Sequence, residues 1–77
     1  MRHKLLDCVV LVKDIPESGL RVGDLGMVVA IYEPDGLEVE FTKASGETQA
    51  VLTLTEADVR PTKADDIISV RPLSLRA

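Results

Sequence analysis

The turn-and-strand pattern of residues 23–41 constrains the fold of this chain more than any other stretch. Gly23-Asp24 and Gly26 supply the permissive backbone of a turn, and an apolar run from Met27 to Tyr32 follows at once. Pro34-Asp35-Gly36 then ends the run, since the proline presets φ and the glycine can adopt a positive φ. The pattern predicts a strand between two turns.

A strictly alternating segment comes directly after the second turn. Apolar and polar side chains occupy opposite sides of it: Leu37, Val39 and Phe41 on one, and Glu38, Glu40 and Thr42 on the other. This period of two is typical of a half-buried strand whose charged side faces water. The sequence therefore predicts a hairpin at the centre of a small all-β barrel.

The composition excludes several chemistries. The chain of 77 residues is expected to form one small domain, and its single cysteine, Cys8, and single histidine, His3, provide neither a disulfide nor a zinc site. A lone thiol favours a reducing compartment. The net charge of -4 disfavours nucleic acid or an anionic membrane as the main partner. No membrane span or signal peptide is expected, so we predict a cytoplasmic protein.

The apolar content is almost entirely aliphatic. Hydrophobic residues make up 45% of the chain, whereas aromatic residues make up only 3%, namely Tyr32 and Phe41. Large aromatic side chains bury more area than valine and fill the centre of most small barrels. An aliphatic chain of this size can compensate by burying a second apolar surface against a copy of itself.

The segment Leu5–Lys13 is predicted to be the first strand, and it is apolar on both sides. Asp7 and Lys13 share the parity of Val9 and Leu11, so this face is expected to point outward and to be covered by another subunit. Cys8 is expected to be a buried, inert thiol. A loop without helix is expected over residues 14–19, because it contains Pro16 and Gly19.

The second half of the domain continues the β pattern. A turn at residues 44–47 places Gly46 where a left-handed residue is tolerated, and residues 48–54 form a strand with Ala50, Leu52 and Leu54 inward. Residues 55–58 have the Thr-x-x-acid spacing of a helix start and room for one 3₁₀ turn. Val59-Arg60-Pro61 then forms a closing strand. The predicted domain spans residues 5–61, with five short strands.

Residues 62–77 are predicted to be a C-terminal tail that serves as an oligomer or partner-docking segment. It is too apolar for plain disorder, so it either packs back on its own barrel or adds as a strand to a neighbour's edge. The tripeptide Val59-Arg60-Pro61 recurs as Val70-Arg71-Pro72, which we interpret as chance.

Several motifs resemble a known family. They are Asp14-Ile15-Pro16-Glu17, Gly23-Asp24-x-Gly26-x-Val28-Val29, Glu38-Val39-Glu40-Phe41 and Asp58-Val59-Arg60-Pro61. Over residues 5–61 the chain resembles an uncharacterised bacterial family of short proteins with a domain-of-unknown-function label. The resemblance implies a small SH3-like barrel and no established activity. Some family members are encoded near toxin–antitoxin-like or mobile elements, which implies a partner-binding role.

The segment at residues 23–29 also resembles the turn of KOW-type barrels, which bind RNA or ribosomal partners. Glu38 and Glu40 on the following strand and the acidic net charge disfavour that function. The same two carboxylates are expected to be a solvated strand face rather than a cation site.

No catalytic residue, metal site or cofactor is predicted. His3 is expected to face solvent at a frayed end, and Asp58 and Arg60 are expected to form a surface pair. No nucleophile motif or phosphate loop occurs.

The remaining signal is apolar surface that one small barrel cannot bury. The candidate interface residues are Val9, Leu11, Met27, Val29, Ile31, Val51, Ile67, Ile68, Val70, Leu73 and Leu75. They predict a non-catalytic protein-interaction module that forms a homo-oligomer or binds a protein partner, as an antitoxin-like protein or accessory subunit. The alternatives are an RNA- or ribosome-associated KOW-like barrel and a small-ligand-binding barrel.

Overall fold

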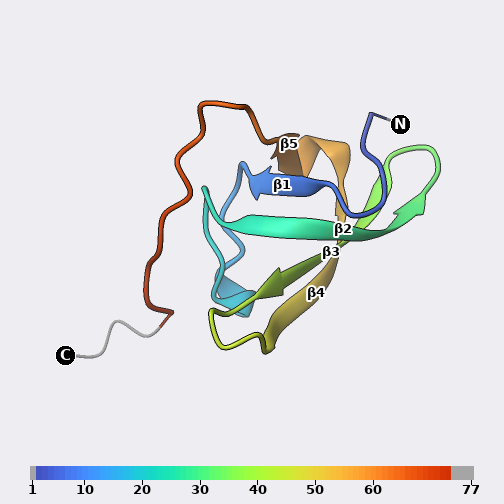
Figure 1. The fold of residues 1–77 in the computed structure, drawn as a ribbon. Helices are drawn as coiled ribbons and strands as arrows, with labels where there is room; N and C mark the ends of the chain where they lie inside the picture. Colours follow the sequence, from blue (N-terminus) through green and yellow to red (C-terminus); the bar gives the residue numbers. More distant parts are fainter. Residues whose placement is uncertain (1, 74–77) are drawn as a thin grey trace.

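The computed structural model describes residues 2–73, and this part of the chain is all-β (Figure 1). Its elements are β1 (Cys8–Leu11), η1 (Pro16–Ser18), β2 (Leu25–Tyr32), β3 (Gly36–Thr42), β4 (Thr48–Thr55), η2 (Glu56–Asp58) and β5 (Val59–Pro61). The five strands form one antiparallel sheet in the order β4-β3-β2-β1-β5. The predicted fold class is confirmed, while closure of the sheet into an SH3-like barrel stays a prediction.

The β2–β3 hairpin lies at the centre of the strand order, as predicted. Leu37, Val39 and Phe41 are buried, and Glu38 and Glu40 point to the opposite side. Two glycines differ from the prediction, because Gly26 lies inside β2 and Gly36 begins β3, whereas both were expected in turns. A Cβ atom on Gly26 would lie 2.6 Å from Val39 Cγ1 and 2.7 Å from Phe41 Cε1, so close packing requires glycine there.

The hydrophobic core joins all five strands. Its members come from every strand and from the loop around η1: Val9, Leu11, Ile15, Leu20, Val28, Leu37, Val39, Phe41, Leu54 and Val59. Ala50 and Leu52 pack against this cluster, which confirms the predicted inward face of β4. One phenylalanine and many aliphatic side chains therefore fill the interior.

The prediction that Val9 and Leu11 face outward is wrong. Val9 is 0% exposed and Leu11 is 1% exposed, so neither can contact a partner, whereas Cys8 is exposed and not the buried thiol that was expected. The reason is the length of β1, which has four residues instead of nine. Asp7 and Lys13 lie outside it, and their parity does not mark a face.

The two short 3₁₀ helices have clear local causes. Thr55 and Asp58 form a capping box around η2, which confirms the predicted turn before β5. The loop at residues 14–19 was expected to lack helix, but Pro16 begins η1 and Gly19, at φ 73°, ends it. A bridge between Ile15 and Leu20 closes this loop.

The N-terminal residues are also placed differently from the prediction. His3 is 3% exposed rather than solvent-facing, and its Nε2 has no hydrogen-bond partner among residues 2–73. Two backbone N–H groups of this segment donate hydrogen bonds, one to η2 and one to β2. The Arg2 N–H donates to Glu56 Oε2 at 3.1 Å, and the Leu6 N–H donates to the Val28 carbonyl at 2.7 Å.

Candidate interaction surface

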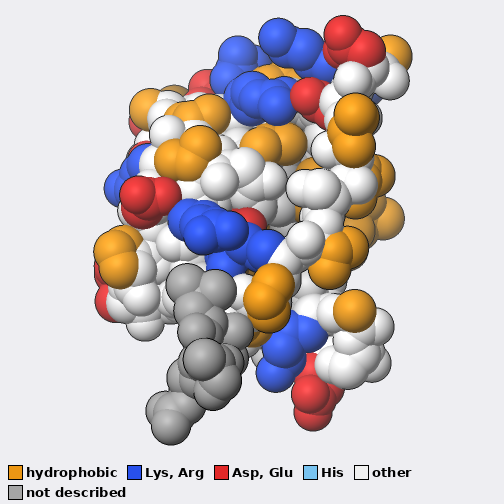
Figure 2. All heavy atoms as spheres, turned by 90° about the vertical axis from the view of Figure 1, so that its left-hand side faces the viewer, with side chains coloured by type: hydrophobic (Ala, Val, Ile, Leu, Met, Phe, Trp, Pro, Cys, Tyr) orange, Lys and Arg blue, Asp and Glu red, His pale blue; other side chains and the backbone are white. Residues whose placement is uncertain are grey.

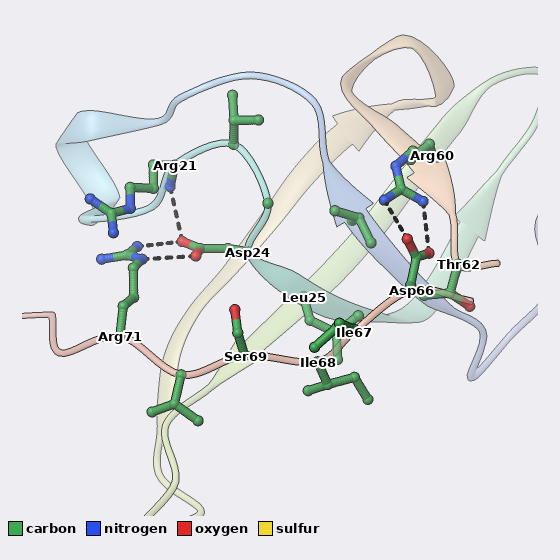
Figure 3. Close-up of a pocket in the computed structure, with 14 residues that line it drawn as sticks. Arg21, Asp24, Leu25, Arg60, Thr62, Asp66, Ile67, Ile68, Ser69 and Arg71 are labelled. Atoms are coloured by element: carbon green, nitrogen blue, oxygen red, sulfur yellow. Dashed lines mark hydrogen bonds and ion pairs between the residues drawn. The ribbon is translucent and has the colours of Figure 1, made fainter. Parts of the chain in front are cut away.

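After β5 the chain leaves the sheet and runs along one side of the molecule (Figure 1). Residues 62–73 contain a turn at residues 64–65 and otherwise no helix or strand. Two arginine–aspartate pairs attach this segment to the domain (Figure 3). The described part of the tail is therefore attached to its own domain at two points, while docking of its apolar side chains on this domain or on a neighbour stays a prediction.

The first attachment, the Asp66 latch, joins Arg60 of β5 to Asp66. Arg60 Nη1 and Nη2 donate to the two carboxylate oxygens of Asp66 at 3.0 Å each, and the Lys63 N–H donates to Asp66 Oδ2 at 2.7 Å. These hydrogen bonds, the Arg60 ones above all, lower the pKa of Asp66 to about 2. The two-point contact fixes the direction in which the tail leaves the sheet.

The second attachment, the Asp24 latch, joins Arg71 to the turn before β2. Arg71 Nε donates to Asp24 Oδ1 at 2.9 Å, and Nη2 donates to Asp24 Oδ2 and to the Gly19 carbonyl. The Arg21 N–H also donates to Asp24. Partial burial alone would raise the pKa of Asp24, but the hydrogen bonds from Arg71 and the Arg21 N–H, with both guanidinium charges, lower it below its ordinary value.

Between the latches lies a segment whose apolar side chains are largely exposed to solvent. Ile67, Ile68 and Val70 are 90%, 78% and 92% exposed. The backbone of residues 67–70 makes no hydrogen bond to any other part of the chain between residues 2 and 73. We call residues 67–70 the display segment. Such exposure of neighbouring large aliphatic side chains is unusual for the surface of a monomer.

An open groove of about 490 Å³ separates the display segment from the domain. On the domain side it is lined by Val22 and Leu25, both exposed, and by the turn at Gly23. Figure 2 shows this side of the molecule, where orange hydrophobic side chains alternate with groups of blue lysine and arginine side chains. The groove is open rather than closed, and Tyr32 does not line it.

The other predicted interface residues are distributed over the sheet and the end of the tail. Val29 and Val51 are exposed, Met27 and Ile31 are half-buried, and Leu73 is partly exposed beside Gly19. Leu75 lies outside the described residues. Of the predicted interface residues, Ile67, Ile68 and Val70 therefore form one exposed apolar segment. The others belong to the sheet or to the end of the tail.

The charged residues pair differently from the prediction. Asp58 lies 3.5 Å from Lys13 Nζ and not beside Arg60, which pairs with Asp66 instead. Glu38 accepts a hydrogen bond from the Thr53 hydroxyl and Glu40 accepts one from the Thr48 hydroxyl. Within residues 2–73, no group of three or more His, Cys, Asp or Glu side chains is arranged to hold a metal ion.

Sequence reasoning missed both latches, although one signal pointed to them. The recurring tripeptide Val-Arg-Pro contains both latch arginines, Arg60 and Arg71. Arg60 faces Asp66 where the tail leaves β5, and Arg71 faces Asp24 at the other end of the display segment (Figure 3). The two tripeptides therefore each contain one arginine that attaches the tail, and the interpretation of their recurrence as chance stays a prediction.

Comparisons with known proteins identify a family and no function. The sequence model of a family described as Domain of unknown function (DUF4926) matches residues 5–61, so the display segment lies outside the match. No curated protein and no solved structure matches the chain. None of the helices in the described part is long and apolar enough to cross a membrane.

Proposed function

The chain belongs to the DUF4926 family, whose description states no activity, and we propose a function for it from its surface. It is a non-catalytic protein-interaction module, and the display segment is the part that contacts a protein partner. The observation that carries this proposal is the combination of two latches with three outward aliphatic side chains between them.

The latches make the display segment a favourable ligand. An unattached tail would lose conformational entropy when it binds, at a cost of roughly 1–2 kcal/mol per residue for the backbone alone. Here Arg60 and Arg71 already hold both ends of the segment, so most of that loss occurs on folding. The side chains of Ile67, Ile68 and Val70 are then free to transfer from water to a partner's surface.

The charged groups nearest to the display segment support a binding role rather than catalysis. Asp24 and Asp66 are both engaged by arginine, and their lowered pKa values keep them ionised at neutral pH. A carboxylate of this kind is a poor general acid or base near pH 7. We extend the proposal to an antitoxin-like or accessory role in a bacterial cytoplasm. The lone cysteine, Cys8, supports only the reducing compartment in this extension.

Co-purification from the organism that encodes the chain tests this proposal. Tagged wild-type chain is expected to retain a protein partner, and the triple variant Ile67→Ser, Ile68→Ser, Val70→Ser is expected to lose it while remaining folded. The matched control, Leu5→Ser, Leu6→Ser, Val12→Ser, removes three exposed aliphatic side chains elsewhere and should keep the partner. Equal retention by the wild type and the display-segment variant, or no partner for either, would overturn the proposal.

A further inference from the structure

The two edges of the sheet are protected to very different degrees. β5, at one edge, has three residues, carries Arg60 and ends in Pro61, all of which oppose pairing with another chain. β4, at the other edge, has eight residues, Thr-Gln-Ala-Val-Leu-Thr-Leu-Thr, with no charge, proline or glycine. In the described structure its only strand neighbour is β3. An edge of this length and composition is suited to accept a further strand.

The backbone of the display segment is also available for strand pairing. Its backbone N–H and carbonyl groups have no partner within residues 2–73, and strand pairing would satisfy them. Its side chains carry no charge, as is also true of β4, so pairing the two would desolvate no ionised group.

The display segment forms no strand pairing with the β4 edge of its own molecule. The latches attach it to β5 and to the turn before β2, and β3 lies between β2 and β4 in the strand order. No ladder connects residues 62–73 to any described strand. A second copy of the chain can supply the missing edge, because it carries an identical β4.

We propose that the display segment of one copy adds as a strand to the β4 edge of a second copy, and that the second copy does the same in return. This inference rests on the proposed function and names its partner. Two reciprocal contacts related by a two-fold axis close the assembly as a dimer and prevent open growth.

The experiment is light scattering coupled to size-exclusion chromatography of the full chain and two surface variants. Wild type is expected to be a dimer. Ile68→Asp in the display segment and Val51→Lys on β4 should each raise the dimer dissociation constant by at least about tenfold, because a charge is placed in an apolar contact. Both side chains are exposed, so the variants should keep the wild-type circular dichroism.

Mixing the two variants gives the decisive result. Ile68→Asp keeps an intact β4 and Val51→Lys keeps an intact display segment, so the mixture should form a heterodimer through one intact contact. Contact between two display segments would be disrupted only by Ile68→Asp, and contact between two β4 strands only by Val51→Lys. Either of those patterns, or a mixture that stays monomeric, overturns the inference.

Two matched controls and one further outcome complete the design. Ala64→Asp and Thr42→Lys add the same charges at exposed positions outside the contact and should remain dimeric. A monomeric wild type that still retains a different protein through Ile67, Ile68 and Val70 would overturn this inference and leave the proposed function standing. A monomeric wild type without any such protein would overturn both.

Discussion

The β2–β3 hairpin and the tail after Pro61 are both rich in aliphatic residues, but different kinds of interaction hold them in place. The hairpin is held by burial of Val28, Leu37 and Val39, and its charged residues face outward. The tail is held by two arginine–aspartate pairs, while its aliphatic residues face outward. The comparison teaches that apolar content alone does not identify a core segment. The predictions that follow test it, beginning with the largest effect.

Removing the same kind of side chain from the two regions should have very different consequences. Leu37→Ala deletes a fully buried side chain and should lower the free energy of unfolding by about 2–5 kcal/mol. Ile68→Ala should change it by less than about 0.5 kcal/mol, because that side chain already contacts water. Urea unfolding at low protein concentration measures both. Comparable losses would show that the tail is part of the cooperative core.

Breaking a latch should release the tail and leave the sheet intact. Arg71→Ala removes every contact that Arg71 makes with Asp24 and Gly19, and tail opening should become about tenfold more frequent, as expected for the loss of a charge-assisted hydrogen bond. Arg71→Lys keeps the charge but loses the two-point geometry, so an intermediate effect is expected. Limited proteolysis between Thr62 and Leu73 measures opening. Unchanged cleavage in Arg71→Ala would show that the latch does not hold the tail.

Acidification should open the same latches without a substitution. The pKa values of Asp24 and Asp66 are lowered in the attached state from the ordinary 3.8, that of Asp66 to about 2. A lowered carboxyl pKa means that the contact is favourable above the pKa of the free group and is lost as the pH falls through the lowered value. The tail should stay attached at pH 5 and detach from Arg60 between about 3.8 and about 2. Amide NMR signals of residues 67–73 would follow this change, and a shift near neutral pH would contradict it.

Local sequence patterns correctly predicted the buried faces of two strands and one 3₁₀ turn. The alternation at residues 37–41 and at 48–54 marked the buried faces of β3 and β4, and the Thr55–Asp58 spacing marked η2. Each of these signals is local, because one face of a strand or one cap suffices to produce it.

The features that the sequence did not predict depend on contacts between residues far apart in the chain. β1 is apolar on both sides, so its parity carried no information, and pairing with β2 and β5 decided which face is buried. The Asp24 latch joins residues 47 positions apart, and ion pairs have no period in the sequence. The segment that contains the buried His3 is likewise held by a distant contact, from the Arg2 N–H to Glu56.

The smallest effect is expected at Cys8, the first residue of β1. The other three residues of this strand are buried, whereas Cys8 is exposed. Cys8→Ser should change the free energy of unfolding by less than about 0.5 kcal/mol. The thiol should also react with iodoacetamide in the folded protein at nearly the rate seen in urea. A strongly protected thiol in the monomer would mean that another part of the chain covers Cys8. The contrast between a buried hairpin and an exposed tail would then not describe the whole chain.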